Sequence, residues 1–143
     1  MKKDLLDKII FYFENAPYHA PANIDNVFLN KVKSFLLKLK PTRFWEKKGI
    51  INRKLKTNVY IDFIMLLENK LIACEVEKSN FNFKFNLFNG IKLFDEIWFF
   101  TNIPVEKTWL FYKLENNLKI KQRFFGVNEK GEIAEINLKS AQS

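Results

Sequence analysis

The sequence is short of the residues from which several common kinds of functional site are built. Among its 143 residues there is one cysteine, Cys74, and one histidine, His19. An intramolecular disulfide is therefore excluded, and neither a zinc site nor a histidine-based catalytic triad has enough side chains. The four glycines are scattered along the chain and form no phosphate-binding loop. We expect Cys74, which lies in an apolar run, to be a small buried core residue.

Long apolar segments are absent as well. No hydrophobic run approaches the roughly 18–20 residues of a membrane-spanning helix, and acidic residues interrupt the N-terminal segment too soon for a secretion signal. Hydrophobic residues nevertheless make up 48% of the chain and include sixteen phenylalanines, which is ample material for a core. We therefore expect one soluble, cytoplasmic domain over residues 1–143, without a membrane partner.

The positive charge of the chain is unevenly distributed. The whole net charge of +8 lies in residues 1–60, where thirteen lysines and arginines stand against five acidic residues, and the remainder is balanced. A basic segment beside a neutral body is typical of a surface that binds a polyanion such as DNA. AT-rich coding sequence would also enrich lysine without any such role. The predicted DNA-binding residues are Lys40, Arg43, Lys47, Lys48, Arg53, Lys54 and Lys56.

The periodicity of the apolar residues predicts an α/β fold in one domain. Stretches with helical spacing alternate with short runs rich in β-branched and aromatic residues, which are typical of strands. Glu68-Asn69 is predicted to form a hairpin turn, and Gly49 is a candidate bulge. These elements predict a central mixed β-sheet flanked by helices. The expected helices span residues 3–14, 24–40, 79–93 and 104–116, and the expected strands span 43–51, 57–67, 70–78, 96–101, 120–127 and 132–138.

Three carboxylates lie on two of the predicted strands, where charge is rarely accepted. Asp62 stands in the middle of an otherwise apolar strand, and Glu75 and Glu77 follow on the next one. Because side chains alternate along a strand, Glu75 and Glu77 share a face, and the hairpin brings Asp62 alongside them. Hard oxygen ligands of this kind favour Mg²⁺ or Mn²⁺. The alternative is that each acid forms an ion pair with a lysine or arginine of a neighbouring element.

The Asp62 strand, the hairpin, the tripeptide Glu75-Val76-Glu77 and the helix expected after it resemble the PD-(D/E)XK nuclease superfamily. That superfamily includes restriction endonucleases and Holliday-junction resolvases, and its core runs helix, three strands, helix, strand. The resemblance implies an αβββαβ restriction-endonuclease-like core over about residues 24–101. The helix at 3–14 and an αββ extension at 102–143 would then be additions to that core.

The resemblance also implies roles for individual residues. Asp62 and Glu75 match the metal ligands of the family, so the expected cofactor is Mg²⁺ or Mn²⁺. Glu77 stands where the family usually has its catalytic lysine. Lys84, on the following helix, is the expected residue to reach back in its place. The predicted catalytic set is therefore Asp62, Glu75, Glu77 and Lys84.

Many members of this family also carry an acid on the first core helix. Asp25 is the one acid that the helix at 24–40 offers, so Glu14 or Glu46 fills this role, or no residue does. The choice depends on how the helices lie against the strands.

Three functions are compatible with these observations. The first is a Mg²⁺-dependent endodeoxyribonuclease that hydrolyses the phosphodiester bonds of DNA at the acidic site. The second is a catalytically inactive nuclease-fold module that binds DNA, which the glutamate at position 77 favours. The third is a viral- or plasmid-type factor that binds another protein through an aromatic surface. A homodimer would suit the first function, because one site of this size cuts one strand.

Overall fold

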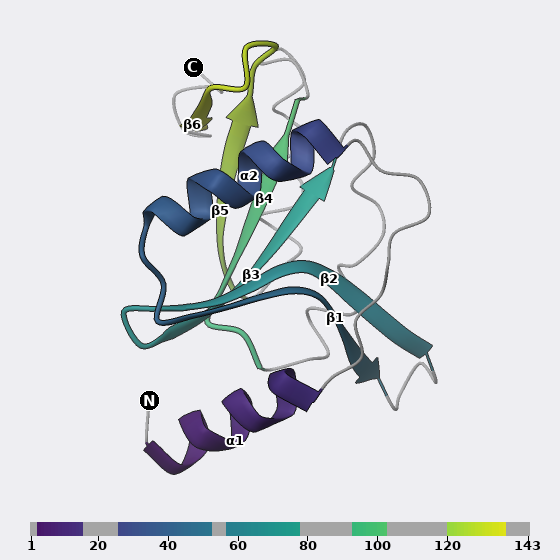
Figure 1. The fold of residues 1–143 in the computed structure, drawn as a ribbon, viewed down its shortest axis with the longest axis vertical. Helices are drawn as coiled ribbons and strands as arrows, with labels where there is room; N and C mark the ends of the chain where they lie inside the picture. The colour runs from purple at the N-terminus through teal and green to yellow at the C-terminus, as the bar shows by residue number, and fades with distance from the viewer. Residues whose placement is uncertain (1–2, 16–25, 53–56, 78–92, 103–119, 137–143) are drawn as a thin grey trace.

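The computed structural model describes residues 3–15, 26–52, 57–77, 93–102 and 120–136. The helices predicted at 79–93 and 104–116 lie outside these residues apart from position 93, and every other predicted element is present with ends that differ by a few residues. In chain order (Figure 1), the elements are α1 (Lys3–Asn15), α2 (Asn26–Lys38), β1 (Arg43–Asn52), β2 (Thr57–Leu67), β3 (Lys70–Glu77), β4 (Glu96–Thr101), β5 (Lys121–Val127) and β6 (Ile133–Glu135).

The described strands form one mixed sheet, in which their order in space is their order in the chain. β1, β2 and β3 form an antiparallel meander, β3, β4 and β5 run parallel, and β6 returns antiparallel to β5. Figure 1 shows α2 lying across this sheet. The α/β class with a central mixed sheet, predicted from the sequence, is therefore confirmed.

The hairpin between β2 and β3 sets the register of the strands that carry the acids. Glu68 and Asn69 both have positive φ, 51° and 64°, as the two central residues of a type I′ turn do. From this turn the ladder continues without a slip to the pair Phe63–Cys74. The predicted turn is confirmed, and the alignment of the two strands follows from it.

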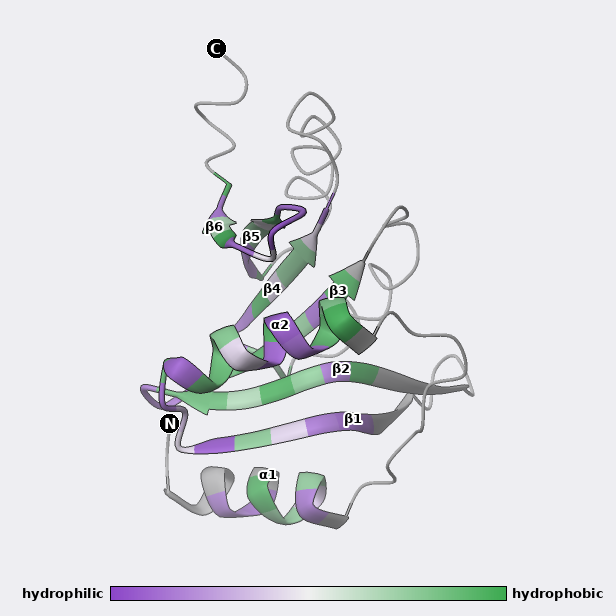
Figure 2. Cartoon of the chain, turned by 45° about the horizontal axis from the view of Figure 1, so that its top comes forward, coloured by the Kyte–Doolittle hydropathy of each residue, from purple (hydrophilic) through white to green (hydrophobic). Residues whose placement is uncertain are grey.

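The sheet buries both of its faces, and each face has its own hydrophobic cluster. We call the side that packs against α1 the α1 face and the side that packs against α2 the α2 face; Figure 2 shows the two helices on opposite sides of β1 and β2. Alternate residues of β3 and β4 belong to opposite faces. The buried residues of the α1 face are Phe13, Trp45, Ile61, Ile64, Leu66, Leu71, Ala73, Phe94, Ile97, Phe99 and Phe124. Those of the α2 face are Phe28, Val32, Leu36, Phe63, Met65, Ile72, Cys74, Trp98, Phe100, Phe125 and Val127.

α2 ends two residues earlier than the sequence predicts. Lys40 has a φ of 57°, and its N–H donates a hydrogen bond of 3.0 Å to the carbonyl of Leu37. A left-handed residue in this position closes a helix by satisfying one of its last carbonyl groups. Lys40 is thereby fixed in the connection that leads into β1, and its side chain is exposed.

Candidate functional site

Asp62 lies at the point where the pairing between β2 and β3 stops. The ladder between these strands runs from the hairpin turn to the pair Phe63–Cys74, and Asp62 is the next residue of β2. Its Oδ2 atom accepts a hydrogen bond of 2.9 Å from the backbone N–H of Val76. The carboxylate thus does what a backbone carbonyl would do in the ladder, and this fixes its position relative to β3.

Glu75 lies beside this contact on β3 and has no exposed surface. By strand alternation Glu75 shares the α1 face with Ala73, and Asp62 shares it with Ile64. Burial raises the pKa of the Cys74 thiol, and the charges of Glu75 and Asp62 raise it further. The fold therefore brings the two predicted metal ligands to one place in the sheet.

The cation that meets Asp62 comes from β1. The Nζ atom of Lys47 forms an ion pair with Asp62 Oδ1, and the two side chains are only 14% and 13% exposed. Lys47 is one of the residues predicted to bind DNA, but its ammonium group is turned inward and held by a carboxylate. The reason is strand alternation, which puts Lys47 on the same face as the buried Trp45.

β1 is distorted at this contact. The residues on either side of Lys47 keep one register with β2, but Lys47 itself has a φ of 50° and the ladder has a gap opposite Asp62. A left-handed conformation costs a residue other than glycine roughly 1–2 kcal/mol. The bulge predicted at Gly49 is wrong, because Gly49 pairs regularly with β2 and the irregularity lies at Lys47.

Of the acids considered for the first helix, Glu14 is the one that reaches the α1 face. Its Oε1 atom accepts a hydrogen bond of 3.1 Å from Nε1 of Trp45. Trp45 is 4% exposed and lies two residues before Lys47 on β1. Glu46 instead forms an ion pair with Lys33 of α2, on the other side of the sheet. A third carboxylate is therefore carried to the α1 face by α1.

The remaining predicted site residues are spread over several parts of the chain. Glu77 ends β3 opposite Thr101 of β4, and its side chain lies outside the described part of the structure. Lys40 and Arg43 are exposed near the start of β1, and Lys48 is partly buried in its middle. The predicted site residues that lie wholly outside the described ranges are Asp25, Arg53, Lys54, Lys56 and Lys84.

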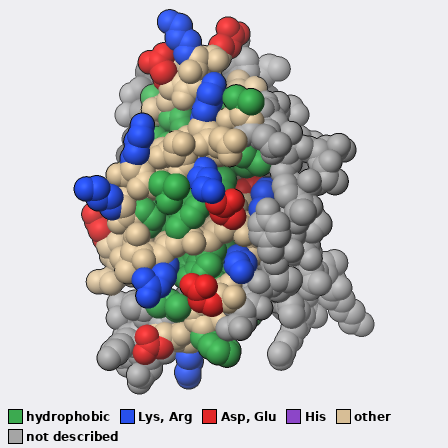
Figure 3. All heavy atoms as spheres, in the orientation of Figure 1, with side chains coloured by type: hydrophobic (Ala, Val, Ile, Leu, Met, Phe, Trp, Pro, Cys, Tyr) green, Lys and Arg blue, Asp and Glu red, His purple; other side chains and the backbone are tan. Residues whose placement is uncertain are grey.

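The side of the molecule that carries α2 has no continuous basic patch among the described residues. Figure 3 shows this side in the orientation of Figure 1, with lysine and arginine side chains standing among acidic ones. The pairs Lys33–Glu46 and Arg123–Glu135 account for part of this mixture. Charges that already have partners of the opposite sign contribute little to holding a polyanion.

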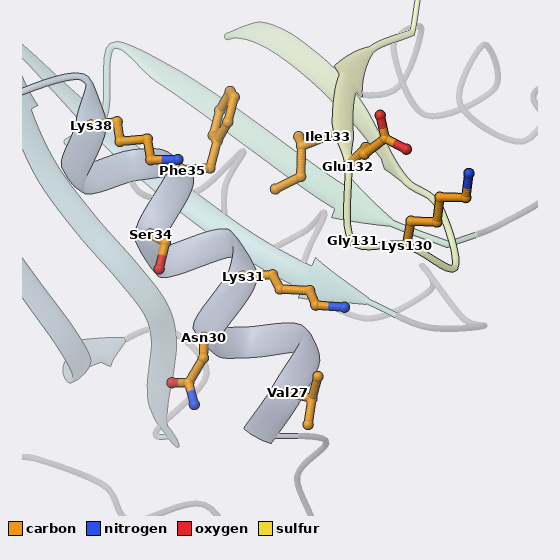
Figure 4. A pocket seen from close by; sticks show the side chains of 10 residues that line it. All are labelled: Val27, Asn30, Lys31, Ser34, Phe35, Lys38, Lys130, Gly131, Glu132 and Ile133. Atoms are coloured by element: carbon orange, nitrogen blue, oxygen red, sulfur yellow. The ribbon is translucent and has the colours of Figure 1, made fainter.

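A hollow of about 650 Å³ lies on the same side, between α2 and the turn that joins β5 to β6 (Figure 4). Three lysines, Lys31, Lys38 and Lys130, are among the residues that line it. Gly131 in this turn has a φ of 81°, which favours glycine, and the end of the Lys31 side chain lies against it. The hollow contains none of the predicted site residues and is separate from the α1 face.

Glu96 is a further buried acid, and its position at the very start of a strand hides it from sequence reasoning. It is 5% exposed, accepts a hydrogen bond of 3.2 Å from Trp98 Nε1, and lies 3.2 Å from Lys70 Nζ. Burial alone raises the pKa of Glu96, but the hydrogen bond from Trp98 and the charges of Lys121 and Lys70 outweigh it and lower the pKa below its ordinary value. The sequence does contain a signal for this contact, because Glu96 and Trp98 are two residues apart on one strand and therefore share a face.

The donor atoms on the α1 face suit a hard divalent cation. Mg²⁺ is usually bound by one or two carboxylates and completes its shell with water, and Asp62 and Glu75 supply two carboxylates. Among the described residues, no group of three or more histidine, cysteine or acidic side chains is assembled. Because the thiol of Cys74 belongs to the α2 face, the oxygen-only set fits Mg²⁺ or Mn²⁺, provided that Lys47 gives up Asp62 Oδ1.

Comparisons with known proteins show no family for this chain. No family model matches the chain, and no curated protein matches it. Among solved structures, it is similar to the crystal structure of protein VC1899 from Vibrio cholerae, with 11% sequence identity and a TM-score of 0.46. The match covers 83% of this chain but 38% of that one. Within the described residues, no helix is both long and apolar enough to cross a membrane.

Proposed function

We propose that this protein is a Mg²⁺- or Mn²⁺-dependent nuclease that hydrolyses phosphodiester bonds of DNA at Asp62 and Glu75. The observation that carries the proposal is the meeting of two acids on one face of a sheet, where Glu75 has no exposed surface. Burying a carboxylate costs several kcal/mol before compensation by opposite charge. Acids brought together in the middle of a sheet, in place of apolar residues, are candidates for a functional site.

The chain would hold and orient the reacting groups through its backbone. Asp62 and Glu75 would hold the ion, which supplies Lewis acidity that activates water and stabilises charge on the phosphate. The N–H of Val76 fixes Asp62, and the parallel pairing of β3 with β4 fixes Glu75 opposite Phe99. Carboxylates held by paired backbone lose little freedom when a ligand binds, which favours a preorganised site.

Two further observations support DNA as the substrate. The first 60 residues carry the whole net charge of +8, and Lys40 and Arg43 are exposed beside the edge strand β1. The described elements also follow the order that the resemblance implies: α2, the three strands β1 to β3, and then β4 parallel to β3. The positive charge favours DNA as the substrate, and the order of the elements favours the restriction-endonuclease-like arrangement, which we propose for the finer details of the fold.

A specific observation also favours a second function, a DNA-binding module that keeps the nuclease fold without catalysis. The ammonium group of Lys47 already neutralises Asp62, and the usual lysine of the motif is replaced by Glu77. Such a protein would bind DNA with a strong dependence on salt and without any need for a divalent metal.

The test is cleavage of labelled DNAs of different forms in Mg²⁺, in Mn²⁺ and in EDTA. We expect the natural protein to cut with metal only, and Asp62→Asn to cut at least about 100-fold more slowly. Glu46→Gln is the matched control, because it removes a neighbouring carboxylate that faces away from the site. It should cut like the natural protein.

Three outcomes separate the two functions. Cleavage that survives Asp62→Asn contradicts the assignment of the site. Tight binding without cleavage in every metal favours the inactive module, and the absence of both binding and cleavage contradicts both functions. Asp62→Asn leaves the ammonium of Lys47 partly buried without its carboxylate, so thermal unfolding must show that this variant is folded before its activity is compared.

A further inference from the structure

Both oxygens of the Asp62 carboxylate are engaged. Oδ2 accepts the hydrogen bond from Val76, and Oδ1 is held by the ammonium group of Lys47. Lys47 belongs to the neighbouring strand and is as deeply buried as the carboxylate that it meets. Oδ1 takes no part in the backbone hydrogen bond and is therefore the natural ligand for a cation. In this structure the chain itself supplies that cation, the ammonium group of Lys47.

The backbone of β1 is held in an unfavourable conformation at this contact. Lys47 has a φ of 50°, and the ladder between β1 and β2 is interrupted there and resumes on both sides. A regular strand would allow this lysine to keep ordinary backbone pairing. The ion pair is therefore maintained against the local preference of the chain, as strained residues at functional sites often are.

A second ion pair, one residue away, shows what an ordinary pair looks like in this protein. Lys33 and Glu46 meet on the α2 side with side chains that are 38% and 35% exposed. No described residue of α2 has a positive φ, and Glu46 keeps its ladder pair. The burial and the backbone distortion are thus specific to Lys47 and do not accompany every ion pair of β1.

The geometry points to Lys47 as a built-in counter-ion that occupies the cation position of Asp62 and is displaced when a divalent metal binds. This inference rests on the proposed function. A divalent cation and an ammonium group repel each other at contact distance and cannot share Oδ1. The flexible four-carbon stem of lysine lets its head group move out to solvent while the strand stays in place. Metal binding is then an exchange of one cation for another.

The first test is calorimetric titration of Mn²⁺ into the natural protein, Lys47→Met and Lys33→Met. Lys47→Met removes the competing cation, so we expect it to bind Mn²⁺ at least about tenfold more tightly than the natural protein, which is about 1.4 kcal/mol. Lys33→Met removes the same charge from the exposed pair and should bind Mn²⁺ like the natural protein. Equal or weaker binding by Lys47→Met overturns the inference.

The second test uses the natural chain, so that it decides the question even if Lys47→Met does not fold. Lysine acetylation by acetic anhydride is followed by mass spectrometry with and without saturating Mn²⁺. We expect Lys47 to be modified slowly in the absence of the metal and several-fold faster in its presence, while Lys33 reacts at the same rate in both. A rate at Lys47 that does not change with Mn²⁺ bound overturns the inference.

The outcomes also separate this inference from the proposed function. If neither the natural protein nor a folded Lys47→Met binds Mn²⁺, the metal site itself is contradicted, and the role of Lys47 with it. If both bind Mn²⁺ equally well, the metal site stands and only the displacement of Lys47 is contradicted.

Discussion

The two faces of the sheet bury similar residues across β4 and β5 but different residues across β1 to β3. Across β4 and β5 each face carries a stacked aromatic pair: Phe99 with Phe124 at 5.3 Å on the α1 face, and Phe100 with Phe125 at 4.7 Å on the α2 face. Across β1 to β3 the buried residues of the α2 face are apolar, and the ion pair of Lys33 with Glu46 on this side is partly exposed. The α1 face there buries charged groups instead.

This difference indicates how stability and chemistry are divided. Apolar contacts on the α2 face gain free energy from each residue that they bury. On the α1 face, Glu75 and the pair of Lys47 with Asp62 have been taken out of water, and a hydrophobic replacement of such groups is often neutral or stabilising. We infer that the α2 face mainly holds the fold together, whereas the charged half of the α1 face is kept for function.

The largest effect that tests this comparison is expected on the α2 face. Phe100 has no exposed surface and stacks on Phe125, so Phe100→Ala should lower the free energy of unfolding by about 3–5 kcal/mol. Urea denaturation of the variant and the natural protein measures this difference. A loss below about 1 kcal/mol would contradict the view that this face carries the stability of the fold.

A smaller effect, dependent on pH, is expected for Glu96. Its folded-state pKa is lowered, so the ionised carboxylate contributes stability above its unfolded-state pKa, and this contribution is lost as the pH falls through the folded-state value. Glu96→Gln should therefore cost about 1–3 kcal/mol at pH 7 and progressively less in acid. Urea midpoints measured across this pH range check it, and a cost that stays constant with pH would show that the charge is not responsible.

The smallest change in stability is expected for Glu75, although it is the most deeply buried of these acids. Glu75→Gln keeps the shape of the side chain and removes a charge that repels Asp62, so the free energy of unfolding should change by less than about 1 kcal/mol or rise. Urea denaturation in the absence of divalent metal is the measurement. A loss of 3 kcal/mol or more would place Glu75 in a stabilising ion pair, and the division between the two faces would fail.

The sequence predicted those features that depend on short-range periodicity. The hairpin turn, the ends of β2 and β4, and the shared face of Asp62 and Glu75 follow from alternation along strands and from the two residues of the turn. These are local properties of the chain, because the position of a residue along its strand determines which face of the sheet its side chain occupies.

The features that the sequence did not predict depend on pairing between distant segments. The sequence predicts a DNA-binding role for Lys47 from its charge alone, whereas the ion pair of Lys47 with Asp62 is evident only when β1 is aligned with β2. The contact of Glu14 with Trp45 likewise depends on which face α1 covers. Neither alignment is encoded in the periodicity of a single strand or helix.

The central claim, that the acids of the α1 face form a metal-dependent nuclease site, is tested most directly by the DNA cleavage rate of Glu75→Gln. The rate is compared with that of the natural protein in Mg²⁺ under single-turnover conditions, after urea denaturation has shown equal stability. We expect a rate at least about 100-fold lower for the variant. A variant that cuts as fast as the natural protein, or a natural protein that cuts no DNA with any divalent metal, would contradict it.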